Sequence, residues 1–394
     1  MKKILILGAG IYQVPLIKTA KELGIYTIVA SIPGNYPGFE LADKVYYENT
    51  TDYQKILNIA RREEVDGIIT AGTDVAVITI GKVCDALGLS GLSFEAAEVA
   101  TDKLLMKQKY EAYGVRTARY REIFFDDDNY AETISELQLP LMFKSVDSSG
   151  SRGIVKVNNA SEYDAARNKV LENTRSDYFI VEEYIDGEEF GAQAFVKDGE
   201  VAFILPHGDY VFKGDTGVPI GHFAPYNLCA DVIEDCKVQL RLAIKAMGLD
   251  NCAINADFIL RDNKTYVLEI GGRSGATCLA ELVSIYYGWN YYERILRTAL
   301  GEDADFTPAV ANGVPNASML LMSDRDGIIK SQSDNNTANP DIVDVQFDYK
   351  VGDSVHAFKV GPHRIGHVIT KGETLDDAVE TLHKALDNIH IEVE

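Results

Sequence analysis

The chain has 394 residues, and its 60 acidic side chains outnumber its 38 Lys and Arg side chains, which gives a formal net charge of -22. This length exceeds what one minimal core needs and predicts three or four modules. A charge of this sign repels nucleic acid and anionic membrane surfaces, so neither is an expected partner. The five cysteines form no C-x-x-C pair, and no apolar run approaches membrane-spanning length. A cytoplasmic location is therefore expected.

The N-terminal part begins with two units of strand, turn and helix. Residues 4–10 indicate a buried strand that ends in a glycine turn, residues 14–23 a helix, and residues 26–31 the next parallel strand. Gln13 stands where a dinucleotide fingerprint has its third glycine, and no acidic residue ends the second strand, so we do not expect NAD. The second unit has a turn at residues 70–74 between a strand and a helix.

Two lysines further along the chain lie in sequence contexts where a lysine can bind phosphate. Lys103 lies in the first turn of a helix expected over residues 104–113. Lys144 opens a Gly/Ser-rich turn over residues 144–153, to which Arg152 adds positive charge. Free backbone N–H groups in such a turn can surround phosphate oxygens. The turn lacks the ending and the helix of a Walker loop, so a plain connection between strands is the alternative.

Residues 179–190 form an apolar strand that runs into an acidic pair and a glycine turn. An adenine ring needs an apolar slot, an acceptor for its amino group and backbone groups at its edge. Glu182 and the backbone of residues 183–185 offer these groups, and Glu189 is placed to accept the ribose hydroxyls. The alternative interpretation is a solvated acidic face.

The clearest chemistry lies in residues 255–273. Asp257 and Glu269 each lie in an apolar, strand-like run, and a polar turn joins the two runs, so both carboxylates are expected to face one pocket. Buried carboxylates are costly without a cation, and hard oxygen ligands suit the Mg²⁺ that accompanies a nucleotide. Arg273 adds a planar fork for a carboxylate or a phosphoryl group. A surface hairpin with scattered charge is the alternative.

Two later stretches complete the chain. Residues 205–214 are polar and aromatic and are expected to form a loop at the border of the site, with His207 and Lys213 as the weakest substrate candidates. An ordinary surface loop is the alternative. The part after about residue 313 alternates short strands and turns and ends in a helix and a strand, which indicates a small β-rich domain.

The order of these features resembles the ATP-grasp superfamily over nearly the whole chain. Within it the sequence is most similar to the carboxylate–amine ligase branch, which includes L-amino acid ligases, biotin carboxylase and proteins like the large subunit of carbamoyl-phosphate synthase. The resemblance implies an α/β fold that is α+β in its ATP-binding part. Residues 1–97 would form a Rossmann-like domain, residues 98–310 an ATP-grasp domain with a mobile lid over about residues 114–180, and residues 311–394 a β-rich C-terminal domain.

The same resemblance gives each motif position a role. Lys103 and Lys144 would hold the phosphates of ATP, and Asp257 and Glu269 would bind two Mg²⁺ ions, with Mn²⁺ as an alternative. Arg273 and Lys144 would be the catalytic groups, with Arg273 positioning the carboxylate and stabilising an acyl phosphate. The remaining ATP-binding positions are Ser148, Ser149, Gly150, Ser151, Arg152, Gly153, Glu182, Glu183, Tyr184, Ile185 and Glu189. The weaker substrate positions are Gly10, Gly72, Thr73, His207 and Lys213.

The implied activity is ATP-dependent joining of a small-molecule carboxylate to an amine or a thiol through an acyl phosphate, with ADP and phosphate as products. A bicarbonate-using carboxylase or carbamoyl-phosphate-type enzyme is one alternative. An ATP-binding protein without turnover is the other, because Gly271 stands where many relatives have Asn, two residues after the second metal carboxylate. A homodimer is common among similar proteins.

Overall fold

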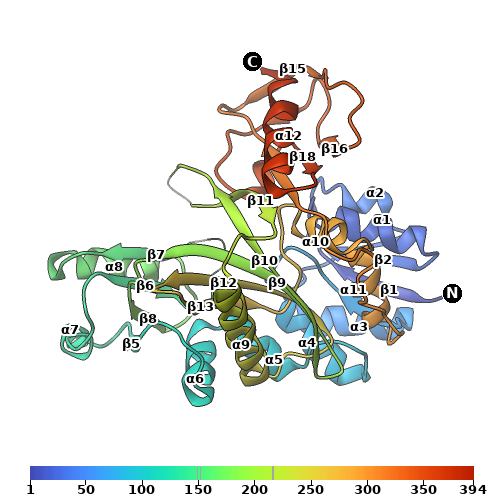
Figure 1. Ribbon diagram of the computed structural model, residues 1–394. Coiled ribbons are helices and arrows are strands. Elements are labelled where there is room, and N and C mark those ends of the chain that lie inside the picture. Colours follow the sequence, from blue (N-terminus) through green and yellow to red (C-terminus); the bar gives the residue numbers. More distant parts are fainter. Residues whose placement is uncertain (149, 151, 215–216) are drawn as a thin grey trace.

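The computed structural model describes residues 1–148, 150, 152–214 and 217–394, whose strands form four sheets. Figure 1 shows the N-terminal region in blue beside a central region in green and yellow, with the C-terminal region in red above both. Among the described helices, none has the length and apolar character needed to cross a membrane.

The N-terminal region is a four-stranded parallel sheet in the order β3-β2-β1-β4. Its elements are β1 Lys3–Leu7, α1 Val14–Glu22, β2 Tyr26–Ser31, α2 Gly38–Leu41, β3 Lys44–Tyr47, α3 Tyr53–Glu63, β4 Gly67–Ile69 and α4 Val77–Leu87. Successive side chains of a strand point to opposite faces, and β1 is apolar on both. Ile4 and Ile6 share a core with α1, whereas Leu5 and Leu7 share one with α3 and α4.

A second, antiparallel sheet has the order β5-β8-β6-β7. Its elements and the two helices before it are α5 Phe94–Thr101, α6 Lys103–Tyr113, β5 Tyr120–Phe124, α7 Tyr130–Thr133, β6 Leu141–Ser145, β7 Ile154–Val157, η1 Ala160–Glu162, α8 Tyr163–Leu171 and β8 Tyr178–Glu183. Phe143 and Phe179 stack with their ring centroids 5.7 Å apart, in a core that includes Val170 of α8. This core holds the turn between β6 and β7 at one edge of the sheet.

The largest sheet has eight strands in the order β13-β12-β9-β10-β11-β14-β18-β16. Its central elements are β9 Glu188–Lys197, β10 Glu200–Val211, β11 Pro219–Ala224, α9 Ala230–Met247, β12 Cys252–Arg261, β13 Lys264–Gly271, α10 Leu279–Tyr287, α11 Tyr291–Ala299 and β14 Asn316–Leu321. Alternate residues of β9 and β12, such as Phe190 and Phe258, form a core with α5, α6 and α9. The opposite face carries Gln193, Asn255 and Asp257 toward one end of the strands, whereas Phe195 and Ala253 on the same face share a second core with α11.

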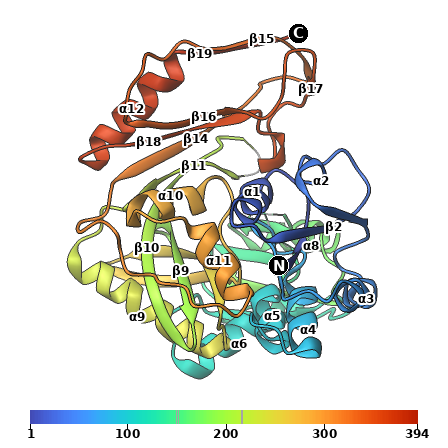
Figure 2. The ribbon, with the colours of Figure 1, turned by 90° about the vertical axis from the view of Figure 1, so that its right-hand side faces the viewer.

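The C-terminal region extends the large sheet and adds a small one. Its elements are β15 Gly327–Asp334, β16 Ile342–Phe347, β17 Ser354–Val355, η2 Gly361–His363, β18 Gly366–Lys371, α12 Leu375–Asp387 and β19 Ile389–Val393. Strands β17, β15 and β19 form the small sheet, and Figure 2 shows α12 on one side of the space between the two sheets. Thr374 and Asp377 form a capping box that starts α12.

The predicted loop at residues 205–214 is wrong over residues 205–211, because β10 continues to Val211. The prediction took polar residues as a sign of solvent. His207 is 3% exposed, since this face of the strand is covered by protein and the His207 ring pairs with Asp209. The same face carries the buried residues Phe203 and Leu205, so no alternation of polar and apolar residues reveals the strand.

An ion pair buried in the C-terminal region yields a test of stability. Arg364 Nε lies 2.9 Å from Asp348 Oδ2, and the two side chains are 5% and 1% exposed. Arg364→Ala leaves a buried carboxylate without its cation, so we expect a loss of about 3–5 kcal/mol in the free energy of unfolding, measured by urea denaturation. Lys384→Ala breaks a solvent-exposed pair with Glu380 and is the matched control, expected to have no measurable effect. Equal stability of the Arg364 variant and the wild type would contradict this.

Candidate active site

Asp257 and Glu269 lie opposite each other on β12 and β13, on the polar face of the large sheet. A register shift follows Asp257, and the chain turns back at residues 261–264 as the sequence pattern indicates. The Asp257 side chain remains accessible to solvent although protein surrounds it on most sides. The two carboxylates therefore share one recessed and open position.

The electrostatics of this pair favour the binding of a cation. Burial first, then the charges of Glu269 and Asp209, raise the pKa of Asp257 to about 7, against the lowering effect of Arg273. Two carboxylates on facing strands repel each other unless a cation lies between them. The donor set, two hard oxygen ligands that solvent can reach, fits Mg²⁺ or Mn²⁺.

Lys103 connects this pair to the Gly/Ser-rich turn. Its Nζ is 3.2 Å from Glu269 Oε1 and donates a hydrogen bond of 2.7 Å to the Ser148 carbonyl. Gly153 closes the base of the turn, where its carbonyl accepts from the Ser145 N–H at 2.9 Å. Gly150 and Arg152 are exposed above it, and the predicted phosphate ligands Ser149 and Ser151 lie outside the described residues.

Lys144 and Glu182 meet in a buried cluster with a third residue, Lys107. The Lys107 Nζ lies 2.8 Å from Glu182 Oε2 and donates to Thr117 Oγ1, and Lys144 contacts the other carboxylate oxygen. Burial favours the neutral acid, but the two ammonium groups outweigh it and lower the pKa of Glu182 to about 2. Two lysines thus contact the Glu182 carboxylate, so an adenine amino group could donate only to a lone pair that neither lysine occupies.

The residues after Glu182 form the end of β8, a short connection that includes Tyr184 and Ile185, and the start of β9. Glu183 pairs with Arg119 at 3.0 Å, and the Tyr184 ring has the Lys156 ammonium 3.4 Å from its centroid. Ile185 is buried. Glu189 is exposed on β9, and its charge acts on the pKa of Lys144. The structure thus places the predicted adenine and ribose positions beside the two-lysine cluster.

Arg273 is bound by a residue of the N-terminal region. Its Nε and Nη2 donate to the two carboxylate oxygens of Asp74 at 2.8 and 3.0 Å. Gly271 lies against the same group, because a Cβ there would be 3.1 Å from Asp74 Oδ1. A side chain as large as Asn at residue 271 would press on Asp74, which gives a physical reason for glycine at this position.

The two N-terminal turns lie beside the segment that follows Arg273. The Gly72 N–H donates to the Ser274 carbonyl at 3.2 Å, and a Cβ on Gly72 would meet Tyr12 Cβ at 2.7 Å. Thr73 follows Gly72, and Gly10 donates its N–H to Gln13 Oε1. Thr277 has φ of 55°, which a β-branched residue rarely adopts and which occurs most often at functional sites.

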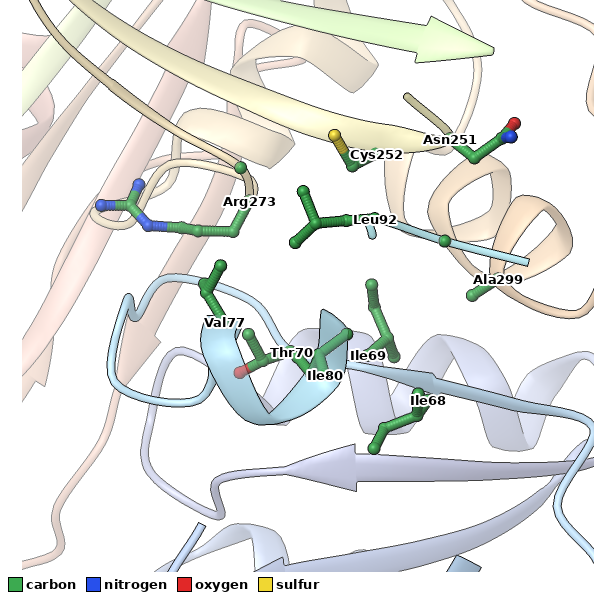
Figure 3. A pocket seen from close by; sticks show the side chains of 12 residues that line it. Ile68, Ile69, Thr70, Val77, Ile80, Leu92, Asn251, Cys252, Arg273 and Ala299 are labelled. Carbon is green, nitrogen blue, oxygen red and sulfur yellow. The ribbon is translucent and has the colours of Figure 1, made fainter. Parts of the chain in front are cut away.

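An apolar pocket lies between β4 and α4 of the N-terminal region and the start of β12 in the large sheet. Its lining includes Ile69, Val77 and Leu92 together with the stem of Arg273. Figure 3 shows the guanidinium of Arg273 pointing away from these side chains. The pocket therefore belongs to the packing between two regions, and the charged end of Arg273 lies on the side of Asp74.

The two remaining substrate candidates, Lys213 and His207, lie in different settings. Lys213 is exposed in the connection between β10 and β11, and within the described part of the chain it forms no ion pair or hydrogen bond with the carboxylate pair. His207 lies on the polar face of the sheet, where Asp209 Oδ1 is 2.9 Å from its Nδ1. The structure thus brings His207, but not Lys213, to the same surface as Asp257.

Sequence reasoning missed Lys107 and Asp74. Helical spacing could have found Lys107, because it lies four residues after Lys103 and so on the same face of α6. Asp74 carries no local signal, because its partner Arg273 is 199 residues away.

The fold and these contacts define a nucleotide-binding protein in which α6 and β6 present lysines, and the β12–β13 hairpin presents paired carboxylates, to one site. The sequence profile of the ATP-grasp domain matches residues 137–281, and that of the L-amino acid ligase C-terminal domain 2 matches residues 319–394. The chain is 36% identical to a solved phosphoribosylglycinamide synthetase from Anaerococcus prevotii, with a TM-score of 0.86 and complete coverage of both chains. The chain belongs to the ATP-grasp superfamily, and the predicted family and fold class are confirmed.

Other relatives are more distant. An L-amino acid ligase from Bacillus licheniformis has a TM-score of 0.82 at 19% identity, over 100% of this chain and 99% of that one, and shares the fold. An alanine–anticapsin ligase from Bacillus subtilis is 25% identical over 285 residues, which cover 65% of this chain and 57% of the relative. The match thus spans little more than half of that protein.

The two-lysine cluster yields a second stability test. Lys107→Met removes one of the two cations that neutralise Glu182 in a fully enclosed position, so we expect a loss of about 3 kcal/mol in the free energy of unfolding, measured in urea at pH 7. Lys109→Met on the same helix, whose partner Glu95 is exposed, is the control and should behave like the wild type. An unchanged Lys107 variant would show that Lys144 alone satisfies Glu182.

Proposed function

We propose that the protein is an ATP-dependent ligase that joins a small-molecule carboxylate to an amine through an acyl phosphate, releasing ADP and phosphate. The observation that carries the proposal is the shared position of Asp257, Glu269 and Lys103, within reach of the Gly/Ser-rich turn. The names of the relatives, two amino acid ligases and a phosphoribosylglycinamide synthetase, support the formation of an amide bond.

The chain's own residues would act by positioning and by neutralising charge. Phosphoryl transfer asks for little covalent chemistry from a protein, so lysines, metal carboxylates and one arginine are sufficient parts. Lys103 would leave Glu269 for the phosphate chain, while Lys144, held by Glu182, would contribute charge from the opposite sheet. Residues 183–185 and Glu189 would receive adenine and ribose.

Asp257 and Glu269 would hold Mg²⁺, with two ions as the proposed number and Mn²⁺ as the alternative. Bound there, the metal would supply positive charge that polarises the phosphoryl oxygens. A solved neighbour of 18% identity, the biotin carboxylase domain of a 2-oxoglutarate carboxylase from Hydrogenobacter thermophilus, is a dimer in complex with MgADP and bicarbonate. A homodimer remains a proposal for this chain.

Arg273 would bind the substrate carboxylate. Its fork is occupied by the Asp74 carboxylate, which has the shape and charge of the group that a substrate would bring. Closure of the turn at residues 148–153 would exclude water, which otherwise hydrolyses an acyl phosphate.

The first test measures ADP and phosphate release with Mg²⁺-ATP across amino acids, other small carboxylates, amines and bicarbonate, with glycine and 5-phosphoribosylamine in the panel because of the similarity to a phosphoribosylglycinamide synthetase. We expect release that needs one organic acid and one amine and that is lost in Glu269→Gln and in EDTA. Release that needs bicarbonate would support the carboxylase alternative. If no substrate in the panel causes release of ADP or phosphate but ATP binds tightly, the result would support a binding protein without turnover.

The second test separates Arg273 from the nucleotide. Arg273→Ala should leave ATP affinity within a few-fold of the wild type by calorimetry and lower turnover by about 10²-fold or more, because a transition-state charge loses its partner. Arg261→Ala, at the exposed tip of the same hairpin, is the control. Equal loss of ATP affinity and turnover would place Arg273 at the nucleotide.

A further inference from the structure

A second polar cluster, to which the proposed function assigns no role, lies on the large sheet. Asp209 Oδ1 is 2.9 Å from Nδ1 of His207 and 2.6 Å from Nδ1 of His222. Both histidines are 3% exposed, and their rings meet edge to face with centroids 5.2 Å apart. Asp209 on β10 pairs directly with His222 on β11, so the side chains share one face.

The strand register places this cluster on the same face as the carboxylate pair. Asp257 on β12 pairs with Gly191 on β9, and Gly191 pairs with His207 on β10. A Cβ on Gly191 would lie 2.2 Å from Cε1 of His207, so the ring lies across β9, on the side toward Asp257. Three strand spacings of about 4.8 Å put His222 roughly 14 Å across the sheet from Asp257, away from Lys103 and the nucleotide side.

Gln193 fixes the proton on His207. The Gly275 N–H donates to Gln193 Oε1 at 2.9 Å, so the Gln193 amide nitrogen is the donor that faces His207 Nε2 at 3.4 Å. His207 Nε2 is therefore the acceptor, and its Nδ1 carries the proton that Asp209 accepts. The three groups place N and O atoms within 4.8 Å of one another, and the hydrogen bonds from both rings to Asp209 account for this closeness.

The same reasoning gives the state of His222. A carboxylate only accepts, so His222 Nδ1 donates to Asp209, and Nε2 is the basic nitrogen of the ring. Burial lowers the pKa of His222 more than the neighbouring Asp209 raises it, which favours the neutral ring. An imidazole whose Nδ1–H is held by a carboxylate is the arrangement in which Nε2 acts as a base.

We propose that His222 is the general base for the amine acceptor and that Asp209 is its positioning residue. The inference rests on the proposed ligase function. A protonated amine has no lone pair, so one proton moves from its nitrogen to His222 Nε2. The neutral amine then attacks the acyl carbon, the C–N bond forms, the bond from carbon to the phosphate oxygen breaks, and the phosphate leaves with that electron pair and with the proton the nitrogen loses on becoming an amide.

The test compares two nucleophiles in His222→Gln, using the acid and amine that support ADP release in the panel. The amine is protonated at neutral pH, whereas hydroxylamine is uncharged there and traps the acyl phosphate as a hydroxamate without a base. We expect amide formation at pH 7 to fall by about 10²- to 10⁴-fold while hydroxamate formation stays near the wild-type rate. The deficit in amide formation should shrink as the pH rises, because solvent then deprotonates the amine.

His383→Gln, which changes an exposed histidine on α12, is the matched control and should leave both rates unchanged. Asp209→Asn tests the positioning role and should also lower amide formation while leaving hydroxamate formation near the wild-type rate. This variant replaces His222→Gln in the test if His222→Gln does not fold. If folded variants lose both products in parallel, or lose neither, the base role of His222 is overturned but the ligase proposal is not. If the wild type makes neither ADP nor hydroxamate with any acid, the ligase proposal is overturned, and the inference about His222 is overturned as well because it rests on that proposal.

Discussion

One buried carboxylate, Glu182, sets the arrangement of the cationic side of the site. It is 1% exposed and is neutralised by Lys107 from α6 and Lys144 from β6, so it ties a helix to the strands of the four-stranded sheet. A buried carboxylate without these cations would be strongly destabilising, so the three groups constrain one another. Because Lys103 lies four residues before Lys107, the same contact directs Lys103 toward Glu269.

The protein gathers positive charge at one site although its net charge is strongly negative. The net charge of -22 would repel a triphosphate, yet Lys103, Lys107 and Lys144 gather within one site. The large sheet contributes Asp257 and Glu269 to this side, and burial first, then the charges of Glu269 and Asp209, raise the pKa of Asp257. In the proposed function, lysines from α6 and β6 and carboxylates from the β12–β13 hairpin would together hold an anionic nucleotide and its metal.

The contact between Asp74 and Arg273 joins the N-terminal region to the reacting end of the site. It is a bidentate pair with both side chains mostly buried, and Gly271 provides the space for it. A substrate carboxylate would have to displace Asp74 or bind beside it, so loading of substrate would act directly on the contact between two regions of the chain. The strained backbone at Thr277 lies in the same segment.

Much of the fold and part of the site follow from the sequence alone. Local pattern determined the parallel strands of the N-terminal region and the hairpin that sets Asp257 against Glu269, because alternation and turn residues act between neighbours in the chain. The order of charged residues indicated the superfamily. The tertiary structure alone decided that Asp74 pairs with Arg273, that Lys107 satisfies Glu182, and that His207 and His222 share Asp209. The physical reason is that a buried charge needs a partner but its own sequence neighbourhood does not specify which one, since the partner comes from whichever distant segment the packing of the sheets brings within hydrogen-bonding distance.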